Sequence, residues 1–140
     1  MAIVGPIILV DDDREDKELL REVLVELGIE NKLIHFENCI IAFDYLKSTA
    51  DIPFIIISDI NLPKKNGIDF KRQIDEDPIL RSKSIPFVFF STSTDKKSVD
   101  VAYKEMTVQG FFQKPTSYHD LKRVIKLIFD YWQECKHPNA

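Results

Sequence analysis

Residues 54–67 read Phe-Ile-Ile-Ile-Ser-Asp-Ile-Asn-Leu-Pro-Lys-Lys-Asn-Gly, an apolar run that meets an aspartate and then a polar turn. Its start is short, apolar and β-branched without alternation, which predicts a strand over 54–59 that is buried on both faces. The Asn, Pro and Gly residues after it predict a loop. A carboxylate is costly in the middle of a buried strand, so we expect the strand to end at Asp59 and deliver it to a polar pocket. In parallel α/β sheets, such a pocket lies outside the carboxyl ends of the strands.

Polar residues follow three other predicted strands: Asp11-Asp12-Asp13 after residues 7–10, Ser91-Thr92-Ser93 after 87–90, and Lys114-Pro115 after 110–113. We therefore expect acids, a hydroxyl and a lysine to meet at one edge of the sheet. A cluster of carboxylates is a hard-oxygen site suited to Mg²⁺, because like charges repel unless a cation joins them. A lysine and a hydroxyl beside the acids suit a phosphoryl group.

The remaining segments alternate with these strands along the chain. Apolar periodicity and capping residues predict helices over 14–27, 38–46, 67–75, 95–106 and 117–134, a further strand over 32–36, and a loop over 77–85. Strands and helices alternate five times, and the right-handed crossover rule then predicts an α/β fold. It is a doubly wound, five-stranded parallel sheet with helices on both faces. We expect one domain over 1–140, with its core at about 6–134.

Composition narrows the function further. The chain has 140 residues, net charge −4 and no basic run, which argues against nucleic-acid binding. No apolar stretch is long enough to cross a membrane, and no basic residue precedes the first apolar run as in a signal peptide. Cys39 and Cys135 lack metal-site spacing, so we expect reduced thiols in a cytoplasmic protein.

Taken in order, the acidic run after the first strand, Asp59 with Asn61 and Pro63, Ser91, and Lys114-Pro115 resemble a response-regulator receiver domain. The resemblance covers nearly the whole chain and implies a flavodoxin-like strand order 2-1-3-4-5. It also implies that Asp59 is the phosphoacceptor. By the same resemblance, Asp12, Asp59 and the backbone carbonyl of Asn61 ligate Mg²⁺, and Asp11 holds the ion through water. Asp13 matches no ligand position and is expected to cap a helix.

The resemblance assigns roles to four further residues. Lys114 would neutralise the phosphoryl charge, and in the family its bond to the following proline is cis, which aims the lysine inward. Ser91 would be the switch hydroxyl that bonds the new phosphoryl group. Phe111 is either the family's rotating aromatic or a plain core phenylalanine, and the sequence does not separate the two. Thr92 stands where the family usually has a small residue and would narrow access to Asp59.

The function that this resemblance implies is a stand-alone, chemotaxis-regulator-like receiver that signals and is not an enzyme with a separate substrate. A histidine kinase or phosphotransfer protein would supply the phosphoryl group. The loop over 77–86 resembles that of receivers serving phytochrome-type kinases, although it is longer. The chain ends soon after the last helix, so we expect no attached output domain. Output would pass through a homodimer or partner face made by the fourth helix (95–106), fifth strand and fifth helix, centred on Leu127 and Tyr131 with Tyr103 beside them.

Two other functions compete with this one. A haloacid-dehalogenase-type phosphatase would use Asp11 as nucleophile and Asp13 as general acid, but the chain has no room for the usual cap domain. A degenerate receiver would act only as a binding module, which the intact Asp59 and Lys114 argue against.

Overall fold

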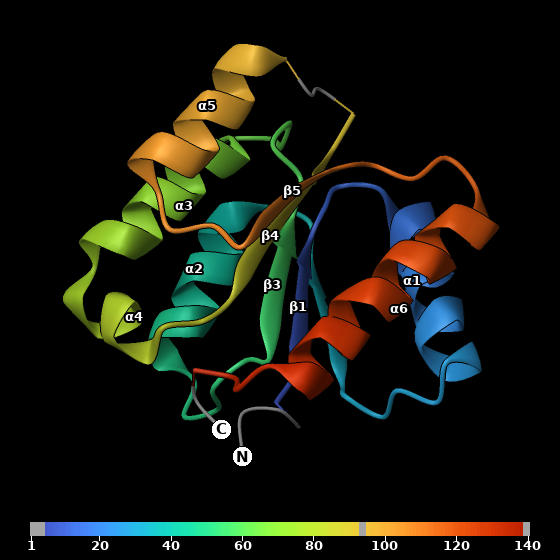
Figure 1. The fold of residues 1–140 in the computed structure, drawn as a ribbon. Coiled ribbons are helices and arrows are strands. Elements are labelled where there is room, and N and C mark those ends of the chain that lie inside the picture. The colour runs from blue at the N-terminus through green and yellow to red at the C-terminus, as the bar shows by residue number, and fades with distance from the viewer. Residues whose placement is uncertain (1–4, 93–94, 139–140) are drawn as a thin grey trace.

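The computed structural model describes residues 5–92 and 95–138, which are built around a parallel sheet (Figure 1). Its strands are β1 (Ile7–Val10), β2 (Leu33–Phe36), β3 (Ile55–Ser58), β4 (Phe87–Ser91) and β5 (Gly110–Gln113). They lie in the order β2-β1-β3-β4-β5, and every neighbouring pair is parallel. The predicted fold class and strand order are confirmed.

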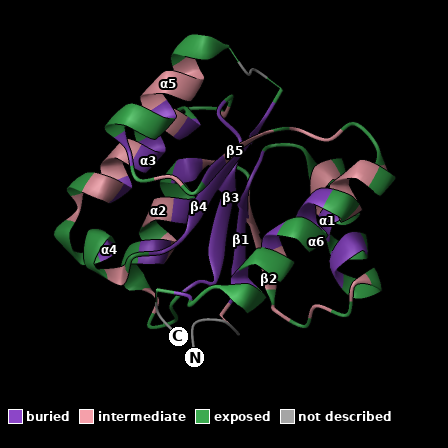
Figure 2. Ribbon diagram, in the orientation of Figure 1, coloured by how far each residue is buried: buried purple, intermediate pink, exposed green. Residues whose placement is uncertain are grey.

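Helices cover both faces of the sheet, as expected (Figure 1). Helices α1 (Arg14–Glu26) and α6 (Tyr118–Glu134) pack on one face; α2 (Cys39–Ser48), α3 (Gly67–Glu76), α4 (Pro78–Lys83) and α5 (Lys96–Glu105) lie on the other. Side chains alternate between the faces, so Ile7 and Ile55 face α1 and α6, whereas Ile8 and Ile56 face the opposite core. The central strands are buried along their length (Figure 2). Within the described residues, no helix is long and apolar enough to span a membrane.

The loop predicted over 77–85 is wrong, because α4 occupies most of it. Asp77 caps this helix by accepting hydrogen bonds from the backbone N–H groups of Ile79 and Leu80, both at 3.0 Å. Pro78 stands in the first turn, where its missing N–H costs nothing. Leu80 is buried in the core and anchors the turn. The cap and proline signals were present, but a helix this short leaves almost no apolar periodicity to detect.

The chain beyond α6 also packs on the sheet. His137 is buried, and its Nε2 donates a hydrogen bond to the backbone carbonyl of Phe54 (2.8 Å). Its ring stacks on Phe54 at a centroid distance of 5.2 Å and lies 5.1 Å from that of Trp132. This tail therefore covers the amino end of β3, opposite the edge where the predicted site residues meet.

A buried ion pair ties α3 to the segment before β5. The Nζ of Lys71 lies 2.7 Å from Asp75, and these side chains are 4% and 14% exposed. Asp75 also accepts hydrogen bonds from the backbone N–H and the hydroxyl of Thr107. Burial lowers the pKa of Lys71, whereas the pKa of Asp75 is lowered because the bonds from Lys71 and Thr107 outweigh its burial. Desolvation of the deeply buried Lys71 offsets much of what the attraction between the two charges gains. The pair then adds little net stability, although losing one partner is costly.

We expect Asp75→Asn to lower the free energy of unfolding by about 2–4 kcal/mol at pH 7, because it leaves the Lys71 ammonium buried without an anion. Urea denaturation measures this loss. Because the folded-state pKa of Asp75 is lowered, the wild-type advantage is complete above about pH 4 and declines as the pH falls through that pKa. Asp69→Asn is the control: it removes an exposed pair with Arg72 on the same helix and should cost less than about 1 kcal/mol. Equal losses would show that the buried pair has no special role.

Candidate functional site

Asp59 follows directly after β3 and is held by the chain around it. Only 7% of the residue is exposed. Its Oδ1 accepts hydrogen bonds from the backbone N–H groups of Ile60 (2.7 Å) and Asn61 (3.3 Å). Its Oδ2 lies 3.2 Å from Nζ of Lys114. One carboxylate oxygen is therefore fixed by backbone and the other faces a cation, so the side chain is oriented before any ligand arrives.

Gly67 lets α3 begin directly against the backbone of Asp59. A Cβ at position 67 would lie 2.1 Å from the carbonyl oxygen of Asp59, which is too close for any other residue. The backbone N–H of Gly67 donates to the carbonyl of Ile60 (2.8 Å) and closes the turn. The sequence predicted this glycine at the end of a loop and the start of a helix, but not its close contact with the backbone of Asp59.

The three acids after β1 divide into two kinds. Ligand oxygens of Asp11, Asp12 and Asp59 lie within 4.8 Å of one another, as the predicted metal set requires. Asp13 instead caps α1 by accepting from the backbone N–H of Glu15 (2.8 Å), as predicted. Burial raises the pKa of Asp11 to about 6, although its hydrogen bonds to Lys114 and Asp13 oppose the rise. Three clustered carboxylate oxygens are a donor set that suits a hard divalent cation.

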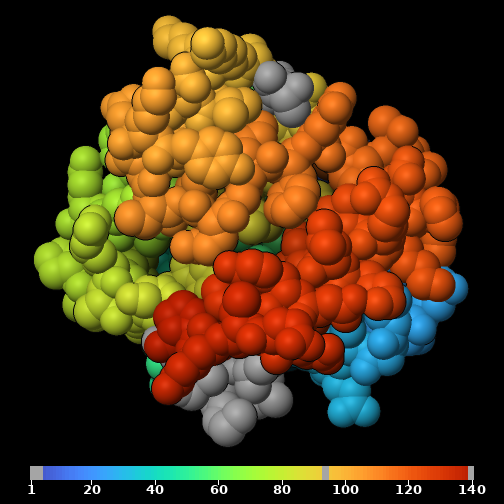
Figure 3. All heavy atoms as spheres, viewed as in Figure 1, coloured from blue at the N-terminus to red at the C-terminus, as the bar shows by residue number. Residues whose placement is uncertain are grey.

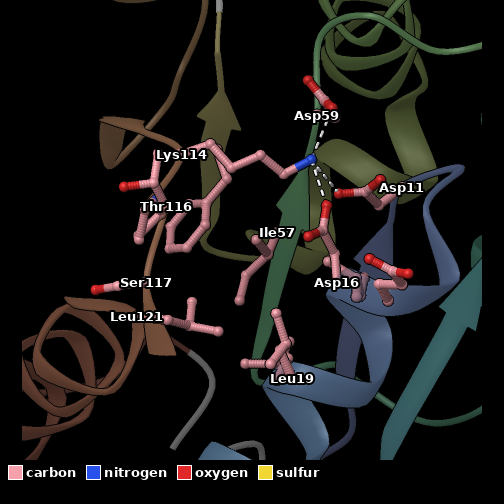
Figure 4. A pocket seen from close by; sticks show the side chains of 14 residues that line it. Asp11, Asp16, Leu19, Ile57, Asp59, Lys114, Thr116, Ser117 and Leu121 are labelled. Atoms are coloured by element: carbon pink, nitrogen blue, oxygen red, sulfur yellow. Dashed lines mark hydrogen bonds and ion pairs between the residues drawn. The ribbon is translucent and has the colours of Figure 1, made fainter. Parts of the chain in front are cut away.

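Lys114 reaches this cluster from the segment after β5. Its Nζ lies 2.6 Å from Asp16, 2.8 Å from Asp11 and 3.2 Å from Asp59 (Figure 4). Burial opposes its charge, but hydrogen bonds to Asp11 and Asp16 outweigh that and raise the pKa of the ammonium. The prediction of a cis peptide bond between Lys114 and Pro115 is wrong, since the described residues contain no cis peptide bond. The lysine still points inward, and its backbone N–H donates to the carbonyl of Ser91 (2.9 Å).

The other predicted residues lie at the same edge or on the adjoining strands. Ser91 is the buried last residue of β4, and Thr92 follows it exposed to solvent. Asn61 is exposed in the turn after Asp59. Phe111 is partly buried, and its ring lies 5.6 Å from that of Phe89 in the core shared with α5. This packing is compatible with both roles considered for Phe111, a rotating aromatic and a plain core phenylalanine.

A pocket of about 340 Å³ extends from Asp59 and Lys114 toward the space between α1 and α6. Leu19, Ile57 and Leu121 form its apolar part, and Thr116 and Ser117 stand at its rim (Figure 4). The candidate site is therefore open on the side where α1 and the segment after β5 approach each other.

Asp16 is the site residue that the sequence did not reveal. It lies in the first turn of α1, where an acidic residue is usually explained by the helix dipole. Helical side chains tilt toward the amino end of their helix, which here is the edge that carries Asp11 and Asp59. This tilt indicates that Asp16 lies near the site. Its partner Lys114 cannot be predicted from α1 alone, because Lys114 follows β5.

Comparison with known proteins places these observations in a family. The model of the response regulator receiver domain matches residues 7–126. The response regulator Rcp1 of Synechocystis sp. is 32% identical over 133 residues, covering 91% of this chain and 88% of the relative.

Two solved structures share the fold. The phosphorylated cyanobacterial phytochrome response regulator RcpA has a TM-score of 0.84 at 28% identity, over 95% of this chain and 97% of that one. The Mn²⁺-bound form of Rcp1 has a TM-score of 0.81 at 30% identity, over 94% and 97% of the two chains. Because the family match runs from β1 past Lys114 into α6, the chain belongs to the response regulator receiver domains of two-component signalling systems.

Proposed function

We propose that Asp59 accepts a phosphoryl group from a phosphohistidine, supplied by a histidine kinase or a phosphotransfer protein. The observation that carries this proposal is the oriented carboxylate of Asp59, with Lys114 on one oxygen and Asp11 and Asp12 beside it. The attacking oxygen forms a bond to phosphorus while the bond from phosphorus to the ring nitrogen breaks. The electron pair of that bond stays on the nitrogen, so the donor leaves as imidazole and Asp59 becomes an acyl phosphate.

The site residues divide the remaining work. Asp12, Asp59 and the carbonyl of Asn61 would hold Mg²⁺ directly, and Asp11 through water. The bound ion supplies charge neutralisation for the phosphoryl oxygens. Lys114 adds a second positive charge beside the phosphoryl group. The hydroxyl of Ser91 donates a hydrogen bond to that group, and the ring of Phe111 changes its packing when Ser91 moves. The Mn²⁺-bound structure of the related Rcp1 supports a divalent ion in this family.

Three further features belong to this proposal: the extent of the domain, the phosphoryl donor and the cell compartment. We propose that residues 1–140 form one receiver domain with its core at about 6–134. The similarity to RcpA, a phytochrome response regulator, supports a phytochrome-type kinase as the donor of the phosphoryl group. Cys39 and Cys135 are free thiols, which supports a cytoplasmic protein. The competing phosphatase is disfavoured, because Asp13, its general acid, is engaged as the cap of α1.

Asp59→Asn should abolish phosphoryl uptake from acetyl phosphate and Mg²⁺ while leaving the circular-dichroism spectrum unchanged, because an amide is nearly isosteric but a poor nucleophile. Mass spectrometry of the intact protein and of its peptides measures the uptake. Asp13→Asn is the matched control, since asparagine caps helices as well as aspartate and labelling should persist. Label retained in Asp59→Asn, or lost in Asp13→Asn, would move the reaction to another residue.

We also propose that Thr92 narrows the approach to Asp59. Thr92→Ala should speed both phosphoryl uptake from acetyl phosphate and later loss of the group, because the donor and the attacking water use the same opening. The time course of phosphoprotein, resolved by mass spectrometry with and without excess donor, gives both rates. An unchanged lifetime in the variant would show that Thr92 does not control access.

The proposed output face lies where α5, β5 and α6 meet. Leu127 and Tyr131 lie off the buried stripe of α6 and are 57% and 56% exposed. They border a groove of about 290 Å³ whose floor includes Phe112 and Val88. The hydroxyl of Tyr103 on α5 accepts a hydrogen bond from the backbone N–H of Phe111 (2.9 Å). Figure 3 shows this side of the molecule, hollowed between α6 and the segment from α5 to β5.

We propose that this face binds a second copy of the chain, with aromatic and leucine side chains at its centre. Leu127→Glu should then weaken self-association of the phosphorylated protein by at least about tenfold while the fold and phosphoryl uptake persist. Sedimentation equilibrium measures the association. Val25→Glu changes an even more exposed apolar residue on α1 and should have no effect. A parent that does not associate would contradict the proposed dimer, and equal association in both variants would place the interface elsewhere.

A further inference from the structure

Lys114 has a carboxylate partner that the proposed chemistry does not use. An ammonium group offers three N–H donors, and three carboxylates surround this one. The shortest contact, 2.6 Å, is to Oδ2 of Asp16 and not to the proposed acceptor, which lies at 3.2 Å. Figure 4 shows the ammonium between Asp59 on one side and Asp16 on the other. The resting protein therefore holds Lys114 toward α1 more closely than toward Asp59.

Phosphorylation changes what Lys114 must bind. A phosphoryl group on Asp59 brings new anionic oxygens that need donors, and the three donors of Lys114 are already engaged. The donor that faces Asp59 can turn to the phosphoryl group, but a second bond from the lysine to that group requires the release of another partner. Asp11 and Asp59 belong to the proposed metal set, whereas Asp16 does not. Asp16 is thus the partner that can be given up without disturbing the ion.

We propose that Asp16 is a positioning residue that holds Lys114 in its resting place and so slows phosphoryl uptake at Asp59. This inference rests on the proposed function. Asp16 makes and breaks no covalent bond; it acts only through the lysine. When the phosphoryl group draws Lys114 away, Asp16 loses its cation beside the pocket between α1 and α6. The carboxylate of Asp16 is then paired with Lys114 in the resting protein and released from it in the phosphorylated protein.

Three variants separate this role from a general effect of charge. Asp16→Asn removes the ion pair and one negative charge. Glu15→Gln removes the same charge from the same turn, and the structure shows no ion pair between Glu15 and Lys114 among the described residues. Asp16→Glu keeps the charge and can still reach the lysine. The rate of uptake from acetyl phosphate is measured by mass spectrometry at saturating Mg²⁺.

We expect Asp16→Asn to raise the uptake rate about 3- to 10-fold, the size of a partly exposed, charge-assisted contact. Glu15→Gln should change the rate less than about twofold, and Asp16→Glu should match the parent. Equal rates in all three variants, or equal acceleration by Asp16→Asn and Glu15→Gln, would overturn the proposal. A parent that takes up no phosphoryl group would instead overturn the proposed function, and this inference with it.

A second measurement needs neither donor nor metal. Acetylation of Lys114 by a soluble active ester, followed by peptide mass spectrometry, reports how firmly the ammonium is held. We expect the Lys114 peptide to react about threefold or more faster in Asp16→Asn than in the parent, and at the parent rate in Glu15→Gln. Unchanged Lys114 reactivity in Asp16→Asn would show that Asp16 does not hold the lysine, whatever the uptake rates are.

Discussion

Asp11, Asp59 and Lys114 form an ion cluster at the carboxyl edge of the sheet, and the geometry of the site follows from it. Asp11 and Asp59 are nearly buried, and neighbouring carboxylates of like charge are unstable without a cation. Strands β1 and β3 are adjacent, so each delivers one of these acids to the same place. Lys114 joins them from the far side of β4. The strand order therefore brings residues that are distant in the sequence together in one site.

The same strands connect the site to the proposed output face by direct contacts. The backbone of Lys114 is bonded to Ser91 at the end of β4. Earlier on β5, Phe111 packs against Phe89 on one side and donates its N–H to Tyr103 of α5. The buried pair of Lys71 and Asp75 holds the start of this region through Thr107. Lys114 and Ser91 are thus connected to α5 by a short series of bonded and packed groups.

Sequence reasoning predicted the fold and most of the site for a definite physical reason. Short apolar runs that end in Asp59, Ser91 or Lys114 carry both signals at once: burial of the strand and a polar end that must face a pocket. Leu127 and Tyr131 were expected at the centre of a partner-binding face, and both are exposed. What failed depended on other parts of the chain. The partner of Asp16, the close approach at Gly67 and the burial of His137 are tertiary contacts that no local pattern contains. Helix α4 was missed because it is too short to show a period.

A crystal structure of the protein with Mg²⁺ and beryllium trifluoride, which mimics a phosphoryl group, would show directly which residues hold the phosphoryl group and the metal. We expect the beryllium to be bonded to a carboxylate oxygen of Asp59 and the metal to lie beside Asp11, Asp12 and the carbonyl of Asn61. The ammonium of Lys114 should lie on a fluorine and away from Asp16. Beryllium on Asp11, a metal outside this set of residues, or Lys114 still paired with Asp16 beside a fully occupied adduct would contradict these expectations.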